Sequence, residues 1–410
     1  MNIWYFNHYA SFPGFGKFSR VHHLGRAWAM DEHITTVFVA RWHHQLGADL
    51  PESETTVDGV RYIALKARRY RGNGVGRILN MMDYCVAMAR LGTRHGIAKP
   101  DLIIVSSPHP FAVVPALRLA SRTGAKLVFE VRDLWPLSIV EVNGTSPWHP
   151  FILLCGFVER LAYRRSDLAA SLLGGAEPYM RSRGLAPHKF IHVPNGIDTT
   201  EKPGLTSDVA RRASALIDDW HDQDRIVIIH PGAQGVPNAL DRLLGAIAVL
   251  NSQGYERRLG VLLVGEGGRT LALKEEAYDL ELENVAFFPP VPKRDALYLI
   301  SRSDIGYAGA RVLDNLYRYG TSFNKVVDFM HLGLPIVLPF RAEHDPVHAA
   351  RCGIVVEEDT AAAIAEAILK LADSTPEMRK ELGRRGQVYV DENLTYERIA
   401  RRYLDAVAVA

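Results

Sequence analysis

The residues Thr321, Ser322, Asn324, Lys325 and Asp328 occur close together and carry the side chains that a nucleotide-binding site needs. An ammonium group beside the free backbone N–H groups of a helix start suits a phosphate or diphosphate. Asp328 follows Asn324 by about one helical turn, where its carboxylate can accept hydrogen bonds from neighbouring sugar hydroxyls. A diphosphate and a diol outline a nucleotide sugar. An equally good interpretation is a surface helix in which Asp328 and Lys325 pair with each other.

One amphipathic helix would position these side chains. Apolar residues recur at the spacing of a buried helical stripe, namely Phe323, Val327, Met330 and Leu334. Thr321 and Ser322 are predicted to cap the free N–H groups at its start. Gly333, with Pro335 just beyond, signals its end. The sequence therefore predicts a short helix with two marked boundaries.

The same segment resembles a known family. Residues 322–330, followed by Gly-Leu-Pro at 333–335, resemble the donor-site segment of retaining glycosyltransferase family four, in the branch that builds bacterial surface polysaccharides. This resemblance implies that Asp328 binds the ribose and that residues 322–325 bind the diphosphate. Many relatives carry a second acid eight positions before the first, where this chain has Gly320.

Composition indicates an ordinary globular protein. The chain has 410 residues, 48% hydrophobic and 23% charged, and this length favours two domains. The three cysteines are far apart, which favours a reducing compartment over a disulfide framework. We expect no signal peptide, because residues 1–10 lack a basic region followed by a long apolar core. We expect no membrane span, because no apolar run approaches about 20 residues.

Apolar strand-like runs alternate with helical stretches, which predicts parallel sheets with covered faces. In the first half these runs lie at 2–6, 35–40, 60–65, 102–106, 126–131 and 168–173. Pro194, Asn195 and Gly196 interrupt the pattern, and the excess of positive charge ends nearby. We therefore place a domain boundary at this point.

Charged residues lie at the end of the predicted strand 126–131 and just beyond it, at the edge where open α/β sheets bind ligands. They are either site residues or turn formers, and the segment 130–136 resembles the acceptor side of the same family. Asp133 is the first candidate for orienting the acceptor hydroxyl or accepting its proton, and Glu130 is the second. Arg132, where many relatives have histidine, is expected to contact the acceptor.

The loop after the first strand contains Gly14, Phe15, Gly16 and Lys17. The spacing matches a phosphate loop only weakly, and a tight turn without a ligand explains it equally well. In the family this loop lies under the donor phosphate and beside the acceptor. The resemblance therefore implies that Gly16 contacts the donor, and that Gly14, Phe15 and Lys17 contact the acceptor.

The second domain opens with a strand, a glycine-containing turn and a helix. Gly232 and Gly235 let the backbone approach a diphosphate, and Asn238 lies just before the helix. Relatives often place an Arg and a Lys where Ala233 and Asn238 stand, so another residue must supply the positive charge. The candidates are Lys325, Arg269 and Arg318. The resemblance alone places the nucleotide base at Val291.

Two cationic patches in the first half could contact anionic lipid. The first, residues 66–77, is predicted to contact phosphate or lipid. The second, residues 148–165, combines an apolar ridge with arginines, and there we favour a buried helix with solvated arginines. The pair Asp222 and Asp224 could hold a divalent metal, but it precedes a strand and is interpreted as a turn. No metal site is expected.

The sequence therefore predicts an α/β chain of the GT-B type, with two Rossmann-like domains facing each other across a cleft. The first domain is expected to span 1–195 plus a returning helix at 395–410, and the second 196–394. The resemblance implies a retaining, metal-independent hexosyltransferase or N-acetylhexosaminyltransferase without a cofactor. It would move a sugar from a nucleoside-diphosphate sugar to a lipid diphosphate-linked saccharide for lipopolysaccharide, O-antigen or capsule.

We expect this enzyme to be cytoplasmic, to bind the inner face of the cell membrane peripherally, and to bind no nucleic acid. Two alternatives remain at this stage. A GT-B sugar-nucleotide epimerase would use the same donor site without an acceptor. A non-catalytic two-domain protein would bind a sugar ligand without turnover.

Overall fold

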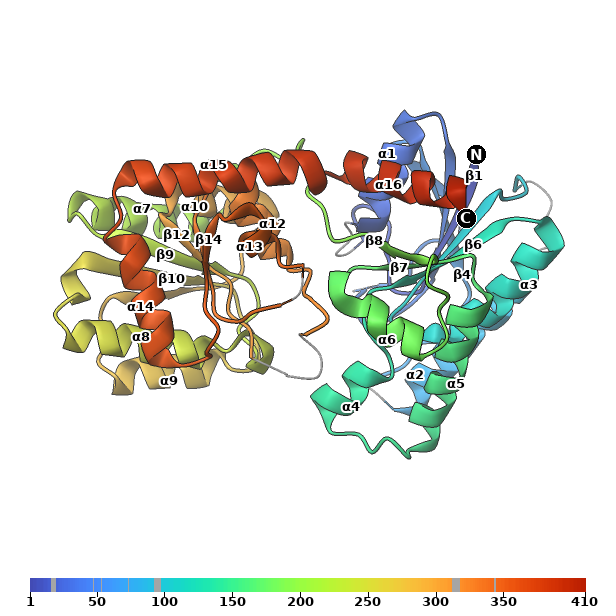
Figure 1. Cartoon of the computed structure of the whole chain (residues 1–410), viewed down its shortest axis with the longest axis horizontal. Coiled ribbons are helices and arrows are strands. Elements are labelled where there is room, and N and C mark those ends of the chain that lie inside the picture. The colour runs from blue at the N-terminus through green and yellow to red at the C-terminus, as the bar shows by residue number, and fades with distance from the viewer. Residues whose placement is uncertain are drawn as a thin grey trace. The chain divides into compact units, whose positions relative to one another are not determined.

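The computed structural model describes residues 1–15, 20–46, 48–52, 54–72, 74–91, 97–311, 318–342 and 344–410. The chain divides into two compact units (Figure 1). Unit 1 comprises Met1–Pro194 and Tyr396–Ala410, and unit 2 comprises Asn195–Thr395. Each is an α/β domain built on a mainly parallel sheet, which confirms the predicted fold class.

Unit 1 has a sheet whose strand order, within the described residues, is β3-β4-β2-β1-β5-β6-β7-β8, and only the β3–β4 pair is antiparallel. Its strands are β1 (Asn2–Asn7), β2 (Ile34–Ala40), β3 (Thr55–Val57), β4 (Val60–Leu65), β5 (Leu102–Ser106), β6 (Lys126–Val131), β7 (Leu168–Ser171) and β8 (Phe190–His192). Its α-helices are α1 (Arg20–Met30), α2 (Val75–Ala89), α3 (Val113–Thr123), α4 (Leu137–Asn143), α5 (Pro150–Arg165), α6 (Glu177–Ser182) and α16 (Tyr396–Val409), with short 3-10 turns η2 (Pro110–Ala112) and η3 (Gly174–Ala176).

The central strands of unit 1 are buried apolar runs, as a sheet covered on both faces requires. Every residue of β5 is buried, and β1 is buried from its second residue onward. The chain runs from β1 to β2 on one side and returns to β5 on the other, so the strand order reverses between β1 and β5. In open α/β sheets, the carboxyl ends of the strands at such a reversal form the ligand crevice.

Unit 2 contains a parallel sheet of order β11-β10-β9-β12-β13-β14 within the described residues. Its strands are β9 (Ile226–Pro231), β10 (Leu259–Val264), β11 (Val285–Phe288), β12 (Ile305–Tyr307), β13 (Ile336–Leu338) and β14 (Gly353–Val355). Its α-helices are α7 (Asp208–Asp222), α8 (Leu240–Ser252), α9 (Thr270–Asp279), α10 (Lys293–Arg302), α12 (Asn324–His331), α13 (Pro346–Ala350), α14 (Ala361–Ala372) and α15 (Pro376–Asn393), with 3-10 turns η4 (Val236–Asn238) and η5 (Glu256–Arg258). The strand order reverses between β9 and β12.

Helices cover both faces of the unit 2 sheet (Figure 1). One apolar core joins the sheet to α7, α10, α12 and α15, and the other joins it to α8, α9 and α14. Because α12 packs within the first core, its buried stripe fixes its orientation against the sheet. The polar side of α12 is therefore held rigidly.

The last helix, α16, belongs to unit 1 although it follows unit 2 in the chain. It packs against α1, where the Trp28 indole Nε1–H donates to the Ala400 carbonyl over 3.0 Å. The rings of Trp28 and Tyr403 meet edge to face at 5.7 Å. Both ends of the described chain therefore contribute to the core of unit 1.

Candidate active site

The start of α12 differs from the predicted capped helix. The helix begins at Asn324, and the residue before it, Phe323, makes no side-chain cap hydrogen bond. The Ser322 hydroxyl instead accepts the backbone N–H of Asn195 over 2.8 Å, and the Asn195 side-chain amide donates to the Ser322 carbonyl. The prediction that Thr321 and Ser322 cap the helix is therefore wrong. Its first N–H groups are not used by a side-chain cap and can face an anion.

The predicted end of α12 is confirmed. Gly333 has a φ of 74°, a left-handed conformation that glycine adopts without strain. The N–H of Leu334 donates to the carbonyl of Phe329 over 2.9 Å, which closes the last turn. Val326, Val327, Phe329 and Met330 are buried, whereas Asn324 is exposed.

Lys325 reaches from α12 to the loop that follows β9. Its Nζ donates to Asn238 Oδ1 over 2.9 Å and lies 3.2 Å from His230 Nε2. His230 Nδ1 is 3.0 Å from the Tyr307 carbonyl, which can only accept, so Nδ1 carries the proton and Nε2 accepts from Lys325. Lys325, Asn238 and Gly232 therefore form one group at the strand-order reversal of unit 2.

This group supplies the positive charge that the β9–α8 loop lacks. Burial lowers the pKa of Lys325 to about 7 and keeps the pKa of His230 well below its ordinary value. Gly232 has a φ of 123°, and an added Cβ there would lie 3.9 Å from Lys325 Nζ. Lys325 thus places its amine beside Asn238, in a loop that carries no cation of its own. The sequence did not predict His230 as a site residue, because His230 lies inside an apolar strand. The signal that could have found it is the presence of a polar residue in such a strand.

Two glycine-containing loops pack tightly beside Lys325. The backbone of Gln234 accepts from the N–H of Arg269 and donates to the carbonyl of Glu266, each over 3.0 Å. A Cβ on Gly265 would lie 2.0 Å from the Gly232 carbonyl oxygen, so no larger residue fits. Gly235 precedes the 3-10 turn that carries Asn238. The loops are therefore fixed close enough to shape a phosphate site.

The other predicted cations have different contacts. The Arg269 guanidinium lies 3.8 Å from the Glu276 carboxylate. The Arg318 guanidinium lies over the Tyr319 ring at 4.8 Å and donates to its hydroxyl over 2.6 Å. These contacts do not include the Lys325 group. Lys325 is therefore the candidate whose charged group contacts the predicted diphosphate loop in the described structure.

Asp328 is buried and forms an ion pair with Lys293, the first residue of α10. The alternative in which Asp328 pairs with Lys325 is therefore wrong. Burial raises the pKa of Asp328, and the Lys293 ammonium partly opposes this rise. Val291, predicted beside the nucleotide base, is half-buried against the core just before Lys293. The structure thus brings the predicted ribose and base segments together, and Lys293 joins them through its ion pair with Asp328.

In unit 1, Glu130 is fully buried and has no oxygen available for an acceptor. Oε1 accepts from the hydroxyls of Tyr5 and Ser106, and Oε2 accepts from Arg20 and from the Tyr403 hydroxyl, over 2.6–3.2 Å. Burial raises the pKa of Glu130, but Arg20 and Tyr5 lower it more, to about 2. We therefore correct the catalytic assignment: Glu130 stabilises unit 1.

Replacing Glu130 by glutamine is expected to lower the free energy of unfolding by about 3–5 kcal/mol, because the buried Arg20 guanidinium is left without its charged partner. The folded pKa lies below the ordinary 4.5, so this stabilisation is complete above about pH 5 and is lost as the pH falls towards 2. Chemical denaturation at several pH values measures it. Unchanged turnover of the folded variant is expected at neutral pH; a lost turnover would restore Glu130 to the site.

Asp133 and Arg132 lie beyond the end of β6. The Arg132 N–H donates to the Ser107 hydroxyl over 2.8 Å, which fixes the start of this segment. Asp133 is exposed, yet desolvation by the surrounding protein raises the pKa of its carboxyl group, and Arg132 opposes this rise. Asp133 therefore keeps the accessibility that a proton-accepting group needs.

The loop after β1 forms a tight turn at its described end. Gly14 has a φ of 87°, and the Phe15 N–H donates to the Phe12 carbonyl over 3.0 Å. The Phe15 side chain is exposed. Gly16 and Lys17 lie outside the described residues.

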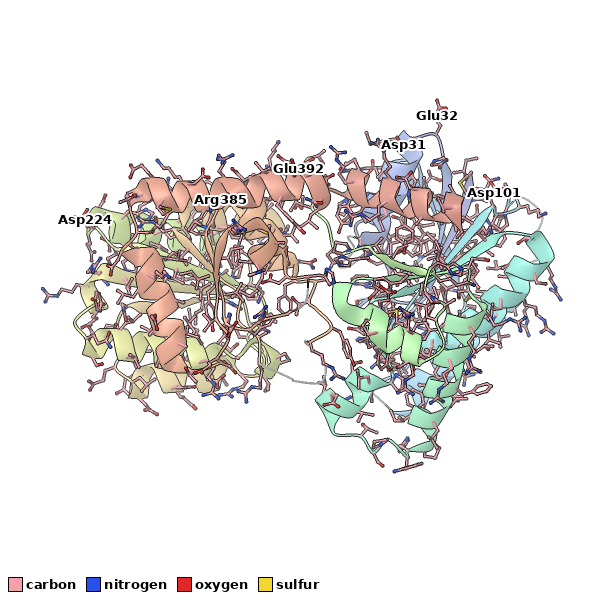
Figure 2. All side chains as sticks on the ribbon, in the orientation of Figure 1. Asp31, Glu32, Asp101, Asp224, Arg385 and Glu392 are labelled. Carbon is pink, nitrogen blue, oxygen red and sulfur yellow. The ribbon has the colours of Figure 1, made fainter. Side chains whose placement is uncertain are left out.

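The described residues contain no group of three or more His, Cys, Asp or Glu side chains placed to hold a metal. Asp222 ends α7, and Asp224 has a φ of 59° in the turn before β9. Figure 2 shows Asp224 on the surface. The pair therefore lies at the amino end of β9, away from the edge that carries Lys325.

Two family descriptions match the chain. Residues 19–196 match "Glycosyl transferase 4-like domain", and residues 225–374 match "Glycosyl transferases group 1". Together they account for most of the chain. Among curated protein sequences, none matches significantly.

Solved structures share the fold along the whole chain. Sucrose-phosphate synthase (tll1590) from Thermosynechococcus elongatus has a TM-score of 0.74 at 16% identity and covers 100% of both chains. WaaG, a glycosyltransferase involved in lipopolysaccharide biosynthesis, has a TM-score of 0.66 at 16% identity, over 100% of this chain and 99% of its own. Anabaena Alr3699/HepE in complex with UDP-glucose has a TM-score of 0.66 at 14% identity, over 100% of both chains.

Proposed function

The chain belongs to the GT-B glycosyltransferases of the family-four type, and from this premise we propose that it is a retaining enzyme of bacterial surface polysaccharide synthesis. It transfers a hexose or N-acetylhexosamine from a nucleoside-diphosphate sugar to a hydroxyl of a lipid diphosphate-linked saccharide. Unit 2 binds the donor, and unit 1 binds the acceptor. Support for the donor class comes from HepE, which is similar to this chain and was solved with UDP-glucose.

The observation that carries this proposal is the meeting of Lys325 with the β9–α8 loop. Lys325 and the uncapped N–H groups of α12 stabilise the negative charge that develops on the departing diphosphate, without a metal. Asp328 accepts hydrogen bonds from the ribose hydroxyls. The acceptor attacks from the face that the diphosphate leaves, a diphosphate oxygen takes its proton, and Asp133 orients the acceptor hydroxyl.

The donor assignment is tested by thermal shifts across a panel of nucleotide sugars and free nucleotides. We expect one nucleotide class to raise the melting temperature by several degrees. Incubation with that donor alone, followed by analysis of the sugar, checks for epimerisation; we expect an unchanged sugar. A panel without any stabilising nucleotide would contradict the proposed function.

A lipid-linked acceptor is supported by exposed apolar side chains on unit 1. The predicted burial of the 148–165 helix is half right: Ile152 and Val158 are buried, but Phe157 is 65% exposed and Trp148, just before α5, is 81% exposed. A second exposed apolar stripe on α2 has helical spacing, at Val75, Leu79, Met82 and Val86. The helix α3 contacts both α2 and α5. We propose that this face adsorbs to the cytoplasmic side of the cell membrane.

No described helix is long and apolar enough to cross a bilayer. The proposed membrane contact is peripheral and is made by the exposed apolar side chains. The double variant Trp148→Glu/Phe157→Glu is expected to bind anionic phosphatidylglycerol vesicles about tenfold more weakly than the unmodified protein in sedimentation. Leu271→Glu, at a 77% exposed position of unit 2, is the matched control and should change nothing. Equal binding by both variants would contradict the membrane assignment.

A further inference from the structure

The strand-order reversal of unit 1 carries a cluster of rings and charges that the donor chemistry leaves unused. His8 follows β1 and His109 follows β5, the strands that flank the reversal, while His44 follows β2 and Arg77 lies in the first turn of α2. The carboxyl ends of these parallel strands share one edge of the sheet. By the same rule that applies to Lys325 in unit 2, this edge is where a ligand of unit 1 is expected.

Tyr9 is the centre of the cluster. Its ring centroid lies 4.4 Å from that of His8, 5.2 Å from His44 and 6.2 Å from His109. The Arg77 guanidinium lies over the Tyr9 ring at 5.4 Å, and Arg77 Nε donates to the Tyr9 hydroxyl over 3.1 Å. Arg77 is thus held in place on a rigid aromatic surface.

The hydrogen bonds of the cluster have a fixed direction. Asn80 Nδ2 donates to the carbonyls of Trp42 and Arg68 over 3.1 and 2.6 Å, so Oδ1 is oriented to accept from His8 Nε2–H at 2.7 Å. Neutral His8 then accepts at Nδ1 from His109 Nε2–H, over 2.9 Å. The remaining nitrogen, His109 Nδ1, is a bare lone pair, and it is buried without a hydrogen-bond partner among the described residues.

Arg77, and not an imidazolium, carries the positive charge at this edge. Burial lowers the pKa of His109 to about 3, and Arg77 lowers it further. Burial holds the pKa of His8 well below its ordinary value, and repulsion by His109 lowers it further. Both imidazoles therefore stay neutral at physiological pH and serve as hydrogen-bonding groups beside a fixed guanidinium.

The neighbouring arginines of the predicted cationic patch bind carboxylates through both arms of their guanidinium groups. Arg68 contacts both oxygens of Asp83 over 2.6 and 3.0 Å, and Arg69 contacts both oxygens of Asp49 over 3.0 and 2.8 Å. Arg77 contacts the Tyr9 ring and the Tyr9 hydroxyl. Arg68 and Arg69 are therefore directed to carboxylates of the patch, whereas these contacts direct Arg77 to the carboxyl ends of the strands.

We propose that this edge is a phosphate subsite for the acceptor. Arg77 binds a phosphate oxygen of a lipid diphosphate-linked saccharide, and His109 Nδ1 accepts a hydrogen bond from a hydroxyl of the same molecule. A planar guanidinium matches phosphate oxygens, and the unsatisfied lone pair requires a donor, which a saccharide hydroxyl supplies. The assignment of this ligand as the acceptor rests on the proposed function.

Glucosyl diphosphofarnesol is the probe, titrated while the donor nucleotide found in the panel saturates unit 2. Arg77→Met is expected to weaken its binding at least tenfold and to leave the binding of farnesyl glucoside, which lacks the diphosphate, unchanged. Arg71→Met, an exposed arginine in the same patch, is the matched control and should have little effect. In ¹⁵N NMR of the histidine rings, the His109 Nδ1 resonance should move upfield when the probe binds.

Equal losses in Arg77→Met and Arg71→Met would show diffuse charge attraction and overturn the subsite. An unmoved His109 resonance in the bound state, or no binding of the probe at all, would also overturn it. Failure of the proposed function gives a different result from failure of the subsite, because no nucleotide sugar would then stabilise unit 2. The probe titration, run in that case without nucleotide, would still decide the role of Arg77.

Discussion

Replacing Asp328 by alanine is expected to weaken nucleotide-sugar binding by about 10- to 100-fold while the chain stays folded. Hydrogen bonds between a carboxylate and hydroxyls contribute about 1.5–3 kcal/mol, and the buried carboxylate has a fixed orientation on α12. Its partner Lys293 is 43% exposed, so its ammonium reaches solvent when the carboxylate is removed. Titration calorimetry with the nucleotide selected in the panel measures the affinity.

Lys293→Met is the matched control for Asp328→Ala. It removes the same ion pair but leaves the carboxylate free for the ribose, so nucleotide affinity should stay within about threefold of that of the unmodified protein. If both variants lost affinity equally, the ion pair and not the ribose contact would explain the loss. An unchanged affinity in Asp328→Ala would place the nucleotide elsewhere.

The place of α12 was predictable because its signals are local. The apolar stripe and Gly333 lie within a few residues of each other, and both act through helix geometry alone. The start was predicted wrongly because the Ser322 side chain is used by Asn195, a residue 127 positions earlier. Local capping rules compete with tertiary hydrogen bonds, and the tertiary bonds prevail here.

The partners of the two charged residues of α12 follow the same logic. The short spacing between Lys325 and Asp328 allows a mutual pair as readily as a ligand site. In the fold, Lys293 lies 35 positions from Asp328, and His230 lies 95 positions from Lys325. Each contact depends on which strand ends share an edge of the sheet. No local pattern contains that information, although His230 interrupts an otherwise apolar strand.

Glu130 lies inside a strand, where the rule for ligand contacts at strand ends does not apply. The rule predicts ligand contacts for residues beyond the end of a strand, and Asp133 satisfies it. Glu130 lies inside β6, and its side chain points into the core, where Tyr403 binds it from 273 positions away. The alternation of strands and helices predicted the α/β fold correctly, because burial of parallel strands leaves a continuous apolar pattern.

Lys325→Ala is expected to lower turnover by about 10²–10³-fold, because a preorganised donor to the departing diphosphate is removed. Initial rates at saturating donor measure it, and undiminished turnover would remove Lys325 from the mechanism. Since the pKa of Lys325 is lowered to about 7 by burial, the free enzyme loses this charge as the pH rises through 7. The kcat/KM for donor should therefore fall from pH 7 to pH 9.

Lys325→Arg separates charge from titration. A guanidinium stays protonated across this range, so the variant should retain more turnover than Lys325→Ala and lose the decline of kcat/KM above pH 7. In the unmodified protein, stability changes with pH in the opposite direction to kcat/KM. The unfolded chain holds a proton on Lys325 up to its ordinary pKa of 10.5, so the free energy of unfolding contributed by this residue rises between pH 7 and 10.5. A loss of stability and donor affinity in parallel would instead indicate general unfolding and contradict a role for the Lys325 charge.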